Sequence, residues 1–493
     1  MFSKNNFALL GLLLGSSVFL FFLIFPPPEG LNEISWLTAG VTILMVIWWV
    51  TEAIPIYATG LIPLILFPLL DLFEIKIVAT SYAHPLVLLF LGGFIIASAM
   101  EDSGLHKRIA LKILGFSGTS PSKIIAGFMI TTALLSMWVS NTASTIMMLP
   151  IATSVIAFFS DQKKILNQSF AIPLLLSIAY SASIGGAATL IGTPTNIMLA
   201  SILSDTYNFH ISFIDWFFIG FPVTVILIPF VWLFLTKIVF KVSSYKSDAL
   251  EKTLLKMKKE VGKPSSTEKV IACIFFIVAT LWIFRKSLND SLSLNLNDTS
   301  IGIFGALLLF IIPCGSNKRA CSWKTANKIP WGVLFLVGGG IALSKAIKDS
   351  GLAEWIGTFS SYLYGLDIYL LVLISVAIII LLTELNSNTA TVATFSPILI
   401  IFAIGLEVNP LIFVIPTTIA ASCAFMLPIA TPPNAVVFGS GKVKINNMMR
   451  AGLLLNIISV FVVTVISLII LNQVFDYDLM NLPDWTTKTN MKN

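Results

Sequence analysis

The sequence has little charge and little cysteine. Asp, Glu, Lys and Arg together make up 11% of its 493 residues, whereas a soluble domain carries roughly 25%. A chain so poor in charge would not stay dissolved in water, which excludes a soluble enzyme and a nucleic-acid binder. Its four cysteines form no CxxC pair and show no metal-ligand spacing, so neither a disulfide framework nor a cysteine-held metal is expected.

Long apolar runs take the place of the missing charge. Hydrophobic residues make up 57% of the chain and gather in stretches of about 20 residues, the length with which a helix crosses a bilayer. The first run is long and lacks a small-residue cleavage site, so it is predicted to be a span, and no targeting peptide is expected. The eleven runs are centred in 7–25, 34–50, 56–72, 84–100, 170–203, 216–238, 270–284, 301–313, 331–347, 411–437 and 450–472.

Two further apolar regions, 123–159 and 367–406, are each too long for one span. A polar cluster interrupts each near its middle, Ser140-Asn141-Thr142 in the first and Ser387-Asn388-Thr389 in the second. Backbone that is irregular at membrane depth must be buried in protein or line a wet cavity. The pattern therefore predicts two re-entrant hairpins, within an all-α polytopic membrane protein of about 11 transmembrane helices.

The basic residues fit this layout with the N-terminus inside. Of the 30 Lys and Arg residues, 23 then fall in inner segments, as the positive-inside rule requires. Reading either hairpin as a crossing would put basic loops on the outer side. The C-terminus is expected outside, and the one long polar segment, 241–269, is expected to be a basic cytoplasmic linker.

The two halves of the chain repeat each other. Four features of the first half recur 247 residues later: the motifs that begin at Gly92, Asp102 and Ser140, and the single Pro150. The first Asp-Ser-Gly-Leu runs into basic residues and the second does not, so the copies have opposite orientation. Inverted repeats are typical of secondary transporters, whose substrate site lies at mid-depth between the halves. The predicted divisions are N-terminal scaffold helices 1–83, repeat 1 at 84–240, the linker 241–269, scaffold helices 270–330, repeat 2 at 331–472 and an external tail 473–493.

A third repeated feature is a proline break within a span. Gly192-Thr193-Pro194-Thr195-Asn196 interrupts 170–203, and Ala430-Thr431-Pro432-Pro433-Asn434 interrupts 411–437. Proline removes a helical hydrogen bond, so both helices should break there. Two hairpin tips and two breaks would then offer helix N-termini, which bind anions, together with carbonyls, amides and hydroxyls.

None of these four polar breaks contains Lys or Arg. A dianion at membrane depth would lack a fixed countercharge, and an isolated charge there is costly. The simplest compensation is a bound cation, which favours cation-coupled transport. The breaks also lack a paired Asp, so an acid-based cation or proton antiporter is not expected.

Two residues beside the second motif keep more than one interpretation. Glu384 either adds negative charge to a cation site or accepts hydrogen bonds from nearby backbone or water, and the second reading is favoured. Asn386 directly precedes the motif where Val139 precedes the first one, and its effect on the cation site is left open.

The paired Ser-Asn-Thr motifs, each followed by a Thr-Pro break, resemble the divalent anion:sodium symporter family over nearly the whole chain. The stretch from Ser136 to Pro150 is most similar to its sodium-coupled di- and tricarboxylate branch. The resemblance implies substrate contacts at Ser140, Asn141, Thr142, Ser387, Asn388, Thr389, Thr431 and Pro432. It implies one sodium site at Ser136, Asn141 and Gly192, and its symmetry mate at Thr383, Asn388 and Ala430.

The resemblance also implies a homodimer with an elevator-type mechanism. The expected function is sodium-coupled symport of C4-dicarboxylates such as succinate, malate and fumarate across a bacterial inner membrane, with sodium co-transported and no organic cofactor. The alternatives within the family are a sodium-independent dicarboxylate exchanger and a sodium-coupled citrate or sulfate carrier. A channel-like anion pore would use the same breaks without sodium dependence. A membrane enzyme is disfavoured because the breaks contain no nucleophilic side chain paired with a general base.

Overall fold

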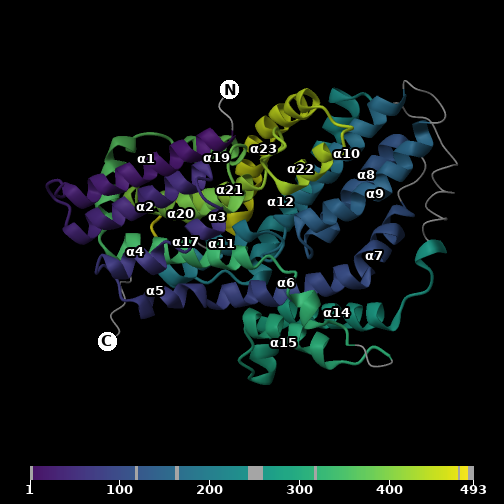
Figure 1. Ribbon diagram of the computed structural model, residues 1–493, viewed down its shortest axis with the longest axis horizontal. Helices are drawn as coiled ribbons and strands as arrows, with labels where there is room; N and C mark the ends of the chain where they lie inside the picture. The colour runs from purple at the N-terminus through teal and green to yellow at the C-terminus, as the bar shows by residue number, and fades with distance from the viewer. Residues whose placement is uncertain are drawn as a thin grey trace.

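The computed structural model describes residues 4–116, 120–160, 166–242, 259–315, 319–475 and 478–486, and the regular elements within these ranges are helices (Figure 1). In chain order the first half contains α1 (Lys4–Ile24), α2 (Glu33–Thr51), α3 (Ile56–Thr59), α4 (Pro63–Leu69), α5 (Ile75–Tyr82), α6 (Pro85–Ser103), α7 (Leu105–Leu114), α8 (Pro121–Ser136), α9 (Asn141–Ser160), α10 (Leu166–Gly186), α11 (Pro194–Tyr207), α12 (Phe213–Leu233) and the π-helical η1 (Phe234–Val239). The second half contains α14 (Ser266–Leu292), α15 (Asp298–Ile311), α16 (Trp323–Ala326), α17 (Trp331–Asp349), α18 (Leu352–Gly357), η2 (Thr358–Leu363), α19 (Ile368–Thr383), α20 (Asn388–Gly405), α21 (Leu411–Ala421), α22 (Pro432–Gly439), α23 (Ile445–Val474) and η3 (Asp484–Thr486).

The predicted all-helical membrane fold is confirmed, and every predicted apolar run forms a helix or a broken pair of helices. Among the described residues, seven helices are individually long and apolar enough to cross a membrane. An eighth candidate is a pair bent by 117° between Leu352–Leu363 and Ile368–Thr383. Shorter apolar helices of the described residues include α8, α15 and α21.

The helices α8 and α9 fill the first predicted hairpin region, and α19 and α20 fill the second. Only residues 137–140 separate α8 from α9, and only 384–387 separate α19 from α20. The two arms of each hairpin pack against each other. Of the predicted linker 241–269, residues 243–258 lie outside the described part of the chain, as do 476–477 and 487–493 of the predicted tail.

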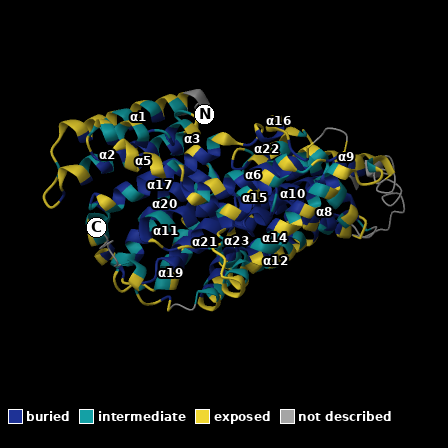
Figure 2. Cartoon of the chain, turned by 90° about the horizontal axis from the view of Figure 1, so that it is seen from below, coloured by how far each residue is buried: buried dark blue, intermediate teal, exposed yellow. Residues whose placement is uncertain are grey.

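Helices from the middle of both halves form the core, and the others surround it. Every residue from Phe170 to Gly186 in α10 is buried, as expected for a helix that is apolar on all sides. Figure 2 shows buried residues along α10, α11, α17 and α20 and exposed ones along the rim. The exposed rim side chains are largely apolar, for example Leu13 and Phe276, which suits a surface that faces lipid.

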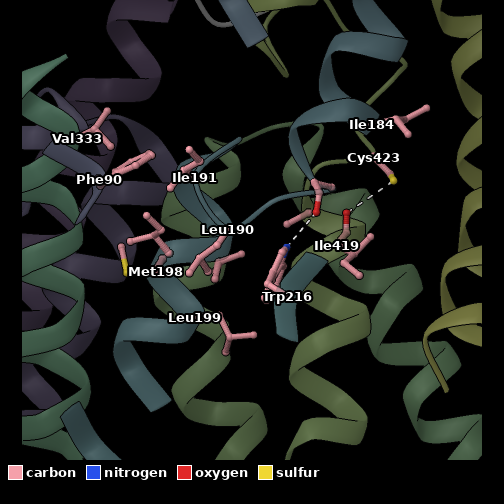
Figure 3. Close-up of a cluster of buried hydrophobic side chains, with 14 of the residues drawn as sticks. Phe90, Ile184, Leu190, Ile191, Met198, Leu199, Trp216, Val333, Ile419 and Cys423 are labelled. Atoms are coloured by element: carbon pink, nitrogen blue, oxygen red, sulfur yellow. Dashed lines mark hydrogen bonds between the residues drawn. The ribbon is translucent and has the colours of Figure 1, made fainter. Parts of the chain in front are cut away.

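The first predicted break lies inside this core. The helix α10 ends at Gly186 and α11 begins at Pro194, a position where proline costs no hydrogen bond because the first turn has free N–H groups anyway. Side chains of Leu190 and Ile191 from the break lie among those of α6, α11 and α17 (Figure 3). The Trp216 indole donates to the Ala187 carbonyl at 3.0 Å, so packing and hydrogen bonding together fix the path of the non-helical segment.

The second break separates α21, which ends at Ala421, from α22, which begins at Pro432. The Tyr180 hydroxyl of α10 donates to the Phe425 carbonyl at 2.8 Å, and the two rings lie 4.9 Å apart. A residue of the first half thus contacts the break of the second half directly. The helix α10 also packs against α22 and α9, which brings both breaks next to the first hairpin.

Candidate functional site

Both hairpin tips and both helix breaks border one cavity of about 740 Å³, within the ordinary range for small-molecule sites. All eight predicted substrate residues line it: Ser140, Asn141, Thr142, Ser387, Asn388, Thr389, Thr431 and Pro432. Four of the six predicted cation ligands line it as well: Asn141, Gly192, Asn388 and Ala430. The other two, Ser136 and Thr383, lie behind the asparagines, to which they are hydrogen-bonded.

Ser136 joins the first hairpin tip to the first broken helix. Its Oγ lies 2.6 Å from the Asn141 Oδ1 and 2.7 Å from the Ala182 carbonyl oxygen. The hydroxyl has one proton, so these three oxygens share a single hydrogen between them. Ser136 is fully buried. We call these three atoms the first oxygen triad.

Thr383 does the same in the second half. Its Oγ1 lies 2.6 Å from the Asn388 Oδ1 and 2.9 Å from the Ala421 carbonyl oxygen. Thr383 is also fully buried, and its position is 247 residues after that of Ser136. This second oxygen triad therefore repeats the first in chemistry, in spacing along the chain and in burial.

Two further asparagines bridge the breaks. Asn196 Nδ2 donates to the Gly186 carbonyl at 3.2 Å and to the Thr189 carbonyl at 2.7 Å. Asn434 Nδ2 donates to the Ala424 carbonyl at 3.0 Å and to the Leu427 carbonyl at 3.0 Å. Both asparagines are fully buried, and each ties the end of one half-helix to the start of the next. Sequence reasoning did not assign them to the site, although both end the repeated break motifs.

Glycine is required where the first break passes the first tip. A methyl group on Gly186 would overlap the Asn141 amide, and one on Gly192 would overlap the Gly186 carbonyl. The absent side chains let the backbone approach the triad closely. The same segment is tied to the hairpin by Thr189, whose hydroxyl donates to the Met137 carbonyl at 2.5 Å.

Glu384 lies in the second tip and is 3% exposed. Its Oε1 accepts from the backbone N–H groups of Phe425 and Met426 at 2.6 and 2.8 Å, and its Oε2 accepts from Leu427 at 3.0 Å. The Asn456 amide adds a fourth hydrogen bond at 2.8 Å. Of the two predicted interpretations, the geometry matches the carboxylate that accepts from backbone, because the freed amides of the second break converge on it.

Charged residues border the cavity at one end. Its lining includes Glu52, Glu101 and Lys328, and the Lys328 side chain is 60% exposed, so the cavity reaches the surface there. Lys328 donates to Asp102 at 2.8 Å, and this hydrogen bond raises the pKa of the Lys328 ammonium above its usual value. Sequence reasoning missed these residues because they lie at or near helix ends that are far along the chain from the polar motifs.

The sequence also matches a known family of membrane proteins. Residues 6–474 match the family described as the sodium:sulfate symporter transmembrane region. The chain belongs to this family. The protein is therefore a membrane transporter and not an enzyme.

Two known proteins are similar to this one over almost the whole chain. The sodium-dependent dicarboxylate transporter SdcS of Staphylococcus saprophyticus is 38% identical over 487 residues, which is 97% of this chain and 94% of that protein. The protein of the same name from Staphylococcus aureus is 40% identical over 482 residues, which is 96% of this chain and 92% of that protein.

Two solved structures share the fold. The YdaH transporter of Alcanivorax borkumensis superposes with a TM-score of 0.56 at 13% identity and covers 97% of this chain and 98% of its own. MtrF of Neisseria gonorrhoeae, an antimetabolite efflux pump, superposes with a TM-score of 0.57 at 13% identity and covers 94% of each chain. At this identity the likeness concerns the arrangement of helices alone.

Proposed function

We propose that the protein is a sodium-coupled symporter of C4-dicarboxylates such as succinate, malate and fumarate. The observation that carries this proposal is the pair of oxygen triads. Each holds a hydroxyl, an amide oxygen and a carbonyl oxygen with one shared proton. Such an oxygen-rich, uncharged group suits a hard monovalent cation, as do the unwound carbonyls of other transporters. The names of the two staphylococcal relatives support the same function.

The dicarboxylate is assigned to the two Ser-Asn-Thr motifs. They enter the cavity from different halves of the chain, so each can bind one of two carboxylates. The helices α9, α20, α11 and α22 all begin at the cavity, and their N-termini carry partial positive charge. Sodium at the two triads would supply the remaining positive charge that a dianion needs at membrane depth.

The cation ligands are then Ser136, Asn141 and Gly192 at one site and Thr383, Asn388 and Ala430 at the other. Sodium is cargo here, and no organic cofactor is needed. Because each triad joins a hairpin tip to a broken helix, an ion bound there would order the tip next to the substrate. We infer that sodium binds first and dicarboxylate second.

The end of the cavity that is bordered by Lys328 is assigned to the cytoplasm. Basic residues concentrate on that side under the positive-inside rule, with the N-terminus inside and the C-terminus outside. The structure then represents an inward-open conformation in a bacterial inner membrane. We further propose a homodimer in which the two repeats move against the scaffold helices in an elevator-type cycle.

The test is uptake of radiolabelled succinate into proteoliposomes, with an inward sodium gradient compared with an equal choline gradient. Saturable uptake that needs sodium supports the symporter. Uptake without sodium that needs internal dicarboxylate identifies an exchanger, and unsaturated flux without sodium identifies a pore. If succinate is not taken up, sodium-driven uptake of citrate or of sulfate identifies one of the other carriers.

The matched variants are Asn141→Ala and Asn388→Ala, one in each triad. Each should abolish sodium-dependent uptake while the protein still inserts and purifies. Normal uptake by both variants would contradict the site assignment, even if the transport activity itself were demonstrated.

A further inference from the structure

The tip of the second hairpin makes a contact that its counterpart lacks. Asn386 directly precedes the Ser387-Asn388-Thr389 motif and is 5% exposed. Its side-chain amide faces the carbonyls of Val50 in α2 and of Leu385, and because both of these neighbours are acceptors, we assign the amide nitrogen to that side. In this orientation Nδ2 donates to the Val50 carbonyl at 2.6 Å and to the Leu385 carbonyl at 3.2 Å. The Val50 bond joins residues that lie more than 300 positions apart in the chain.

The acceptor is a carbonyl at the end of a helix. Val50 lies in the last turn of α2, which ends at Thr51, and the last four carbonyls of a helix have no partner within it. The N–H groups that follow, those of Glu52 and Ala53, both donate to the Trp48 carbonyl. The Val50 carbonyl therefore depends on a donor from outside the helix, and Asn386 supplies one.

This hydrogen bond connects two walls of the cavity. Glu52, two residues after Val50, lines the cavity, and so does Asn388, two residues after Asn386. The bond thus lies where α2 meets the second hairpin, beside the substrate motif. Separating the hairpin from α2 would break it and take this partner from the Val50 carbonyl and from the buried Asn386 amide.

The first hairpin is held differently. Val139 occupies the position equivalent to Asn386, and its side chain is apolar and 2% exposed. The neighbouring Trp138 packs against the rings of Phe213 and Phe275, with centroid distances of 5.8 and 4.8 Å. Aromatic contacts tolerate sliding, whereas a hydrogen bond weakens steeply when its geometry is lost. The first tip is also hydrogen-bonded, but its bond comes from Thr189 in the first break, whereas the residue before the second motif donates to α2.

We propose that Asn386 is a positioning residue that fastens the second hairpin to α2 and so stabilises the conformation in which the cavity opens beside Lys328. The inference rests on the proposed alternating-access transport. It concerns the balance between conformations and assigns Asn386 no contact with substrate or sodium. It also answers why the second motif is preceded by a polar residue and the first is not.

The test measures that balance directly. Ile429 lines the cavity and is 70% exposed, so Ile429→Cys, in a chain whose four native cysteines are replaced, reports access to the cavity. A membrane-impermeant maleimide is applied from either face of proteoliposomes of known orientation, and the ratio of the two labelling rates follows the ratio of the two conformations. Asn386→Leu, which keeps the shape but loses the donor, should shift this ratio toward the opposite face by roughly fivefold, the effect of one net hydrogen bond.

Asn386→Asp is the second variant, because an ionised carboxylate cannot donate and should shift the ratio in the same direction. Val139→Leu, at the equivalent place in the first hairpin, is the control and should not shift it. An unchanged ratio in both Asn386 variants overturns the proposal. If the ratio is unchanged and the sodium requirement for uptake is raised, the proposal is also overturned, and Asn386 belongs to the cation site instead. If the parent protein is labelled from one face at every sodium and succinate concentration, the alternating access itself is wrong.

Discussion

Ser136 and Thr383 hold the asparagines of the two Ser-Asn-Thr motifs in the same way. In each half the hydroxyl lies 2.6 Å from the Oδ1 of the asparagine five residues later. Each hydroxyl also reaches the carbonyl of a helix just before a break, Ala182 in one half and Ala421 in the other. The repeated motif in the sequence thus corresponds to a repeated cluster of atoms.

Removing one hydroxyl should weaken one cation site without unfolding the protein. Ser136→Ala and Thr383→Val each delete a hydrogen bond with a net value of about 1 kcal/mol, and each also removes a proposed sodium ligand. We expect the sodium concentration for half-maximal uptake to rise roughly fivefold to tenfold in each variant. The measurement is succinate uptake against sodium concentration. A change in maximal rate alone, with the sodium dependence intact, would contradict the assignment.

Adding a methyl group next to the first triad should displace Asn141. In Gly186→Ala the new Cβ would overlap the Asn141 amide, so we expect sodium-dependent uptake to be lost. The matched control is Gly439→Ala, because a Cβ there meets no atom within 4 Å, and it should transport normally. Size-exclusion chromatography of both variants distinguishes a displaced side chain from a failure to fold.

Neutralising Glu384 should destabilise the second break. Glutamine keeps one acceptor oxygen but turns an NH₂ group toward backbone N–H donors, so at least one hydrogen bond to a charged group is lost, at about 1.5–3 kcal/mol each. We expect Glu384→Gln to lower the melting temperature of the detergent-solubilised protein clearly. Glu260→Gln, at an exposed position, serves as the control. Equal melting temperatures for the two variants would show that the four hydrogen bonds of Glu384 contribute little.

Lys328 should affect substrate entry more than stability. Its ion pair with Asp102 is largely exposed, and such pairs contribute little to folding. A positive charge at the cavity mouth attracts an anion, and salt screens that attraction. Lys328→Gln should therefore raise the half-saturating succinate concentration for transport from that side at low ionic strength. The difference from the parent protein should shrink in 0.5 M choline chloride, because at about this salt concentration charges more than a few ångströms apart are screened.

The pH dependence of this effect has a definite sign. Asp102 raises the pKa of Lys328 above that of an ordinary lysine. Lys328 therefore keeps its proton, and the pair keeps its contribution to folding stability, at every pH below the ordinary lysine pKa. Both are lost only as the pH rises through the higher pKa of the folded protein. The effect of Lys328→Gln should then be the same at pH 6 and pH 9. A difference that disappears by pH 9 would mean that Lys328 loses its proton early and is not paired as described.

The sequence predicted the class of fold and the composition of the cavity well, because both depend on patterns that the chain repeats. Apolar runs identified the helices, the shared offset paired Asn141 with Asn388, and the resemblance to a known family implied Ser136 and Thr383 as equivalent cation ligands. The eight predicted substrate residues line one cavity, while their roles and the division into scaffold and moving segments remain predictions.

Contacts between distant segments were out of reach of such patterns. Nothing near Lys328 in the chain relates it to the polar motifs, since its place at the mouth follows from how α6 packs against the segment before α17. The hydrogen bond from Asn386 to Val50 likewise depends on where α2 happens to end. Asn196 and Asn434 were within reach, because a buried amide at the end of each repeated break could have been matched to the freed carbonyls of that break.

The bond from Tyr180 to the Phe425 carbonyl has a consequence for how the protein is made. Synthesis proceeds from the N-terminus, so Tyr180 is made 245 residues before its partner Phe425 exists. Until then the Tyr180 hydroxyl has only water, lipid headgroups or the insertion machinery to contact, whereas the Gly186 carbonyl already has Asn196 as a donor. The first half alone therefore cannot supply a hydrogen-bond partner for each of its polar groups. We expect a chain that stops before α21 to be recognised and degraded as a misassembled protein.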